Sequence, residues 1–206
     1  MEGHWDKIYE EKGQTKNFSW YEESPQESLK EIKNSLQDEE NFSIIDIGTG
    51  MSMLPDYLLK LYPKSNITLL DISKESLHIT QSRLGDEFKK IQMIVSSVVE
   101  YDFKEDSFDI WHDRAVFHFL TDTKDQEKYV ALCHKALKMG GIAIIMTFSY
   151  PDGPTKCSNL TIQQYSPETL EKKFGTGFEM LDSRKFIHKT PSGNEQVFIC
   201  CRLQKI

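Results

Sequence analysis

The residues with the clearest chemical pattern are a glycine-rich turn and an acidic residue that follows it. Asp46 lies near the end of a short apolar run, and Gly48 and Gly50 come directly after it, with Thr49 between them. Glycines at such a point let the chain turn sharply and let a ligand approach the backbone. Asp71 ends the next apolar run, 21 residues after Gly50, where a carboxylate can accept hydrogen bonds from both hydroxyls of a ribose. The pattern predicts a nucleoside site.

A dinucleotide-dependent oxidoreductase is the main alternative for such a turn, and one position disfavours it. The dinucleotide fingerprint needs a third glycine, so that the following helix can approach the strand and hold a pyrophosphate on its first turn. Met53 takes that position in this chain. A bulky side chain there suits a nucleoside without phosphates, such as a sulfonium nucleoside.

A second group of polar residues follows a later apolar run, in the sequence FDIWHDRAVFHFL. Asp113 is placed to orient a reacting group, with capping of the next turn as the alternative. His118 is a candidate base, although a half-buried structural histidine fits the same pattern. His112 and Arg114 are similarly placed. Cys157 lies in a polar loop, either as a reactive thiol or as an ordinary loop cysteine.

Alternating strand and helix patterns from residue 44 onward predict the elements that position these residues. The last two strand patterns are separated by the turn-prone TPSGN, so they pair antiparallel. A helix is expected to begin at Ser24, which would cap it together with Glu27. We therefore predict an α/β fold with a seven-stranded, mostly parallel sheet, an antiparallel C-terminal hairpin and helices on both faces. The predicted strands are residues 43–48, 66–73, 91–97, 108–113, 142–148, 177–189 and 195–203.

Aromatic residues dominate the first segment, which shows no periodic pattern and is expected to be irregular. They are Trp5, Tyr9, Phe18, Trp20 and Tyr21. They can form a lid that closes on the ligand and walls an acceptor pocket. Alternatively, they anchor the first helix on the sheet.

Composition and charge limit the partners. The chain has 206 residues, 38% of them hydrophobic and 28% charged, which suits a single α/β domain. The net charge is −7 and the lysines are scattered, which disfavours a nucleic-acid partner. No apolar run is long enough for a membrane span, and the N-terminal residues do not resemble a targeting signal, so we expect a cytoplasmic protein. The four cysteines contain no CxxC pair, so no metal site is expected.

These motifs resemble, in order, those of the class I S-adenosylmethionine-dependent methyltransferases, which have a Rossmann-like fold. The resemblance covers residues 40–150, and residues 107–120 are similar to the family's fourth motif. It implies a cofactor-binding core at 40–150, an N-terminal lid or cap at 1–38, and a closing helix and hairpin at 151–206. The sequence GTGMSML, with Ser52, and the N-terminal HWDKIYEEKG also resemble methyltransferases that modify protein lysines.

The resemblance implies a role for each cofactor residue. Residues 46–50 would lie under the methionine part of S-adenosylmethionine, and Asp71 would bind the ribose. Ile72 would flank the adenine. Ser97 occupies the position at which many members carry an aspartate for the adenine amino group, and the Val98 backbone amide can also serve the adenine.

The fourth motif would face both cofactor and acceptor, which implies residues for the transfer itself. Asp113 is the first candidate for catalysis and for a further cofactor contact. His118 is the second catalytic candidate. Trp20, Tyr21, Arg114 and His118 are the candidate acceptor-binding residues.

Methyl transfer from a sulfonium is an in-line displacement that needs alignment more than proton transfer. The leading hypothesis is transfer to a small-molecule acceptor through S, N or O, leaving S-adenosylhomocysteine. A protein lysine N-methyltransferase is the alternative, and it predicts an open acidic cleft. A catalytically silent cofactor-binding protein is the third. Acceptor identity and oligomeric state are not determined by the sequence.

Overall fold

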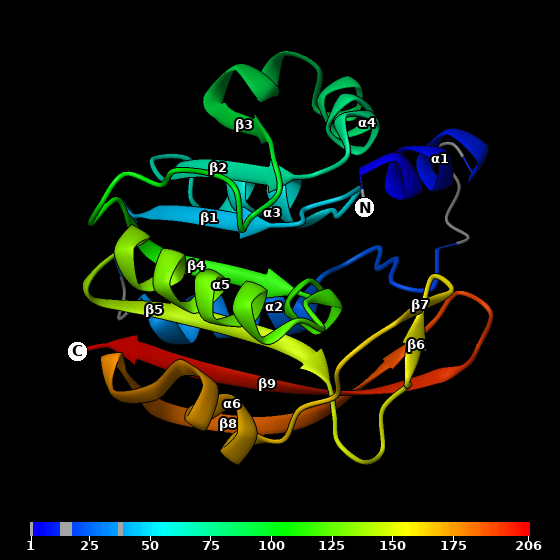
Figure 1. The fold of residues 1–206 in the computed structure, drawn as a ribbon. Coiled ribbons are helices and arrows are strands. Elements are labelled where there is room, and N and C mark those ends of the chain that lie inside the picture. The colour runs from blue at the N-terminus through cyan, green and yellow to red at the C-terminus, as the bar shows by residue number, and fades with distance from the viewer. Residues whose placement is uncertain (1, 13–17, 37–38) are drawn as a thin grey trace.

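The computed structural model describes residues 2–12, 18–36 and 39–206, whose strands form a seven-stranded sheet. The strand order is β3-β2-β1-β4-β5-β9-β8 (Figure 1). Pairing is parallel from β3 through β5 and antiparallel on both sides of β9. This confirms the predicted Rossmann-like fold with its antiparallel C-terminal hairpin. The strands are β1 (Ser43–Ile47), β2 (Asn66–Asp71), β3 (Ile91–Val95), β4 (Phe108–Arg114), β5 (Leu137–Phe148), β8 (Phe178–Lys189) and β9 (Glu195–Lys205).

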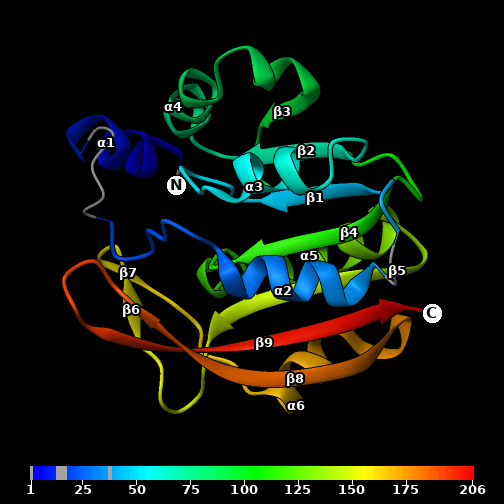
Figure 2. The ribbon, with the colours of Figure 1, turned by 180° about the vertical axis from the view of Figure 1, so that it is seen from behind.

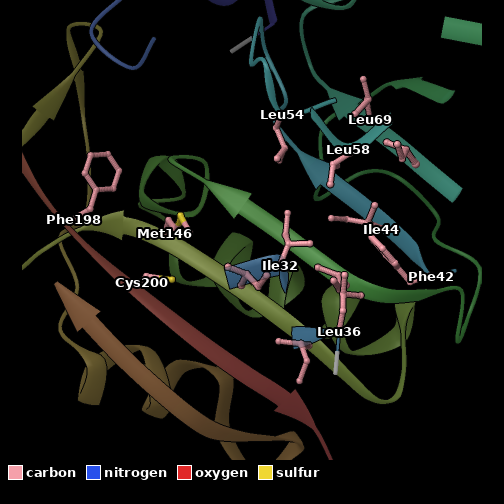
Figure 3. Packing of buried hydrophobic residues seen from close by; sticks show 14 of the residues in the cluster. Ile32, Leu36, Phe42, Ile44, Leu54, Leu58, Leu69, Met146, Phe198 and Cys200 are labelled. Atoms are coloured by element: carbon pink, nitrogen blue, oxygen red, sulfur yellow. The ribbon is translucent and has the colours of Figure 1, made fainter. Parts of the chain in front are cut away.

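Helices cover both faces of this sheet. On one face lie α2 (Gln26–Ser35), α3 (Leu54–Leu61) and α4 (Lys74–Leu84), with α2 and α3 in front in Figure 2. On the other lie α5 (Thr123–Ala136) and α6 (Pro167–Phe174) (Figure 1). Figure 3 shows side chains of the core on the α2 face, where Ile32 of α2 and Leu36, which follows that helix, lie over the central strands. Short 3₁₀ turns are η1 (Gly85–Lys90), η2 (Phe117–Phe119) and η3 (Gly175–Gly177).

The start of α2 differs from the prediction. Pro25 occupies the N-cap position, and no side chain caps the helix. The Ser24 hydroxyl instead accepts a hydrogen bond from the Gln26 side chain. Glu27 does not close a capping box, because it forms an ion pair with Arg184 on β8. A partner distant in sequence thus outcompetes the local motif.

The prediction of an irregular first segment is wrong for residues 2–12, which form the helix α1 (Glu2–Lys12). The helix is mostly polar, and its buried face is aromatic, so the sequence carries little helical periodicity. It lies beyond the carboxyl ends of the parallel strands and packs on α4 (Figure 1). A small hairpin of β6 (Lys156–Cys157) and β7 (Leu160–Thr161) was also not predicted.

The four cysteines are free and buried. Cys200 faces the α2 side of the sheet and Cys201 the α5 side, since neighbouring residues of a strand point to opposite faces. Within residues 2–12, 18–36 and 39–206, no three His, Cys, Asp or Glu side chains cluster as a metal site would require. No helix in these ranges has the length and apolarity needed to cross a membrane.

Candidate active site

The glycine turn between β1 and α3 has a backbone that other residues cannot adopt without strain. Gly48 and Gly50 have φ values of 62° and 53°. The Gly48 amide donates to the Leu70 carbonyl at 2.7 Å, which fixes the turn on β2. A Cβ at Gly48 would lie 2.1 Å from Val116 Cγ2, and one at Gly50 would lie 2.7 Å from the Tyr9 hydroxyl. Both positions therefore require glycine.

Asp71 lies at the end of β2, beside this turn. Its Oδ2 accepts from the Gly50 amide at 2.8 Å, and its Oδ1 accepts from the Ser73 amide at 2.7 Å. Burial raises the pKa of the carboxyl to about 6, despite these hydrogen bonds. The predicted spacing thus brings Asp71 and Gly50 into direct contact.

Asp46 belongs to a buried polar chain that crosses three elements. Its Oδ1 lies 2.6 Å from His112 Nδ1, and His112 Nε2 lies 3.0 Å from the Ser28 hydroxyl on α2. The other carboxylate oxygen, Oδ2, is buried and has no hydrogen-bond partner among the residues described. A buried carboxylate oxygen without a donor is costly, so this atom is suited to a ligand that supplies one.

Two adjoining cavities open at the carboxyl edge of the sheet. The glycine-turn cavity lies over residues 46–52 and is also lined by Tyr9, Trp20, Tyr21, Glu22, His112 and Arg114. The inner cavity has a volume of about 120 Å³ and runs from β2 across β4 to β9. Its walls include Trp5, Tyr9, Trp20, Gly48, Asp71, Ile72, Ser97, Val98, Arg114, Phe119, Phe148, Cys157, Gln196 and Phe198.

Arg114 lines both cavities from the end of β4. Its guanidinium donates to the Trp20 carbonyl at 3.1 Å and pairs with Glu22 at 2.9 Å. His188 lies 3.3 Å from the same guanidinium. Burial alone would raise the pKa of Glu22, but His188 and Arg114 hold it below its ordinary value. The arginine is therefore held at the junction of the two cavities.

The helix α1 closes this edge of the molecule through contacts with several elements. Asp6 accepts from the Ser73 hydroxyl at 2.6 Å, which ties α1 to the start of α4. His4 Nε2 lies 3.2 Å from the Ser158 carbonyl in the β6–β7 hairpin. The Trp5 ring packs edge-on against Phe119, with ring centres 5.1 Å apart. The aromatic face of α1 therefore lies at the edge of the cavities, and its action as a lid stays a prediction.

Asp113 is fully buried and lines neither cavity. Its carboxylate accepts from the amides of Val116 and Phe117, at 2.9 and 3.1 Å, and from the Tyr129 hydroxyl at 2.5 Å. Burial raises the pKa of the carboxyl to about 6. The structure thus favours the capping alternative over a role beside the acceptor, because this carboxylate binds two amides of the following turn and the Tyr129 hydroxyl of α5.

His118 is also fully buried and absent from both cavity walls. Its ring stacks on Phe148, with centres 4.5 Å apart, and Phe148 separates it from the inner cavity. Burial, with the charge of Arg114, lowers the pKa of the imidazole to about 3. Neither ring nitrogen has a hydrogen-bond partner within the described chain. The geometry favours the structural alternative for this histidine.

Residues 45–145 match the family model of the methyltransferase domain. This match, the strand order and the ordered motifs together decide the family. Residues 45–145 belong to the class I S-adenosylmethionine-dependent methyltransferases, and the sheet that contains them has that family's fold.

The relatives of this chain are named for different acceptors. Malonyl-[acyl-carrier protein] O-methyltransferase 2 of Ilyobacter polytropus is 27% identical over 110 residues, which are 53% of this chain but only 40% of that protein. EEF1A lysine methyltransferase 2 of Danio rerio is 27% identical over 192 residues, covering 86% of this chain and 75% of that protein. The structure of the N-methyltransferase NodS from Bradyrhizobium japonicum WM9 with S-adenosylhomocysteine has a TM-score of 0.70 at 14% identity, and 98% of each chain is covered.

The residues at this edge of the sheet fit S-adenosylmethionine, the cofactor that the family match implies. Asp46 lines the glycine-turn cavity, and its buried Oδ2 has no partner among the residues described, so this carboxylate is suited to a ligand amine. The inner cavity offers Asp71 next to apolar walls from Ile72 and Val98, which suits a nucleoside.

Sequence reasoning missed several residues of this site. Ser28 and Phe198 come from α2 and β9, far from the motifs, and Gln196 lies beside Phe198 in the cavity wall. No local signal marks them. Asp6, by contrast, is followed three residues later by Tyr9. This helical spacing is a weak sign of a helix that presents a polar and an aromatic side chain on one face.

Proposed function

We propose that this chain transfers a methyl group from S-adenosylmethionine to a small molecule held in the inner cavity. The observation that carries the proposal is the largely apolar, aromatic lining of that cavity. Trp5, Trp20, Phe119, Phe148 and Phe198 form most of its aromatic wall, and Trp5 comes from α1. A small, aromatic-lined cavity suits a small acceptor better than a side chain on a folded protein.

The cofactor is held, in this proposal, by residues on three strand ends. The Asp71 carboxylate accepts hydrogen bonds from the ribose hydroxyls, and Ile72 and Val98 flank the adenine, with Ser97 as a further polar contact. The turn at residues 46–50, Thr49 included, lies under the methionine part.

When bound, the cofactor supplies an electrophilic methyl group on a sulfonium. The protein then has to align the acceptor with that methyl and exclude water, because a displacement of this kind gains most from orientation. Trp5 and Trp20 cover the cavity, while Arg114 and Phe198 orient the acceptor. Tyr21 lines the glycine-turn cavity instead, so it is placed to contact the methionine part. Asp113 and His118 hold the turn after β4 in place.

The test is an incubation with methyl-labelled S-adenosylmethionine and a soluble cell extract, followed by separation by size. We expect label in the small-molecule fraction with the wild type and none with Asp46→Ala/Asp71→Ala. Label that appears only on protein would overturn the small-molecule proposal. Cofactor binding without label in either fraction would favour the silent binding protein instead.

A protein lysine acceptor is the second candidate, favoured by two observations. The lysine methyltransferase from Danio rerio aligns with 86% of this chain. An open groove beside α2 is lined by Glu22, Glu23 and Glu27 together with Phe186 and Ile187, a combination suited to a basic peptide. The groove is separate from the inner cavity, however, and Glu22 and Glu27 are already paired with arginines.

A further inference from the structure

The side of the inner cavity formed by β4, β5 and β9 carries a cation and lacks an available base. Among the described residues that line the cavity, the ionisable ones are Tyr9, Asp71, Arg114 and Cys157. Asp71 is bonded to two backbone amides. Burial raises the pKa of the Tyr9 hydroxyl and of the Cys157 thiol, so both stay neutral. Arg114 is thus the charged group that an acceptor on this side meets.

Arg114 has donors that its present partners do not use. The guanidinium carries five N–H groups, and its contacts to Trp20, Glu22 and His188 come from the two terminal nitrogens. Its Nε is buried and lacks a hydrogen-bond partner in the portion of the chain described. The guanidinium also lies 5.5 Å from the centre of the Phe198 ring, a cavity wall. It therefore stands beside an apolar surface, ready to bind an anion.

We propose that the acceptor is a small apolar or aromatic molecule whose nucleophile is an anion bound by Arg114, either a carboxylate or a thiolate. This proposal rests on the proposed function. The nucleophile's lone pair forms the bond to the methyl carbon while the carbon–sulfur bond of the cofactor breaks and its electron pair stays on sulfur. No proton moves in this step, which agrees with a cavity that lacks a base.

An amine acceptor fits this cavity poorly. Near neutral pH only about one primary amine in 2,500 is unprotonated. An amine acceptor therefore either needs a base that removes its proton or binds only as the rare neutral form, with a large loss of affinity. The bound sulfonium and Arg114 would both repel the protonated form. A carboxylate is already ionised, and the same two positive charges favour the thiolate form of a thiol.

The test compares three probes that share one ring and differ in the reacting group: 3-phenylpropanoate, 2-phenylethanethiol and 2-phenylethylamine. Binding to the protein saturated with S-adenosylhomocysteine is measured by calorimetry, and methyl transfer by product mass. We expect the carboxylate or the thiol to bind about tenfold more tightly than the amine, and the product to show which of the two accepts the methyl. Equal or tighter binding of the amine, or binding of none of the three, overturns the proposal.

Variants at Arg114 and Glu22 assign the effect to the guanidinium. Arg114→Gln should weaken binding of the favoured anion about tenfold and Arg114→Lys less, with cofactor affinity changed by no more than about twofold. Glu22→Gln, which removes the competing carboxylate, should strengthen anion binding. It keeps the test available if Arg114→Gln does not fold. A loss that falls on cofactor affinity instead would show that Arg114 holds the cofactor and would refute the assignment. Failure of the wild type to bind S-adenosylmethionine, by contrast, would reject the proposed function itself.

Discussion

Replacing Gly50 by alanine tests whether α1 closes over the glycine turn. Gly50 has a φ of 53°, and an added Cβ would lie 2.7 Å from the Tyr9 hydroxyl oxygen. The left-handed conformation costs an alanine about 1 kcal/mol, and displacing the hydroxyl adds about 1 to 2 kcal/mol. We therefore expect Gly50→Ala to lower the free energy of unfolding by about 2 to 3 kcal/mol.

The second half of the test removes the hydroxyl that the new methyl group would meet. Tyr9→Phe loses a buried hydroxyl that hydrogen-bonds to the Trp20 side chain, at a cost of about 1 kcal/mol. In the double variant with Gly50→Ala only the backbone strain and this lost hydrogen bond remain. The double variant should therefore be about 1 to 2 kcal/mol more stable than the sum of the single changes predicts.

The coupling between the two substitutions separates the contact from the backbone strain, because the strain of an alanine at position 50 is the same with and without the Tyr9 hydroxyl. Urea unfolding without cofactor measures all the variants. If Gly50→Ala and Tyr9→Phe add without coupling, then the Tyr9 hydroxyl of α1 does not lie on the glycine turn.

Three further predictions follow from the site. Lowering the pH through about 6 protonates Asp71, so S-adenosylmethionine affinity should fall toward tenfold per pH unit in calorimetry. The raised pKa of Asp71 has the opposite effect on the stability of the unliganded fold. The stability that this carboxyl contributes is complete below its unfolded pKa and is lost as the pH rises through about 6. Unfolding caused by Asp71 therefore does not explain a loss of cofactor affinity at low pH. Tyr129→Phe removes a hydrogen bond to Asp113 and should lower the free energy of unfolding by about 1 to 3 kcal/mol. It should leave the acceptor KM unchanged, because Asp113 anchors a turn. A changed KM in steady-state kinetics would contradict that role of Asp113. Asp6→Ala should weaken cofactor binding severalfold, because it frees α1 from α4. Lys7→Ala removes only an exposed ion pair and should leave cofactor binding unchanged. Equal effects of the two variants would argue against a role for the Asp6–Ser73 hydrogen bond in cofactor binding.

The parts of the fold that were predictable are those set by neighbouring residues. The apolar runs and the turns between them give the strand sequence, and Asp71, singled out by its spacing from the glycine turn, lies beside that turn and accepts from the Gly50 amide. Ser73 caps α4 through a local contact, because its hydroxyl accepts from the Ser76 amide within the same turn. Such features depend on short stretches of chain, so a single sequence carries them.

The features that could not be predicted depend on partners far along the chain. Asp46 meets His112 and Ser28 only after β1, β4 and α2 pack together. Asp113 looked like a reacting group because it follows a strand, yet Ala115 adopts a φ of 72° and turns the following amides back onto its carboxylate. Periodicity cannot show that reversal.

The inner cavity is lined partly by residues inside the family match and partly by residues outside it. The family match at residues 45–145 contains the turn at residues 46–50 and Asp71, so family membership implies the cofactor. On the side of β5 and β9, however, Phe148, Cys157 and Phe198 lie outside the match, and so does the covering helix α1. Arg114 is the charged group within the match that reaches this side. In the proposed function, the charge of the acceptor is therefore set by a residue inside the match and its shape by segments outside it. This would let relatives that share the cofactor core differ in their acceptors.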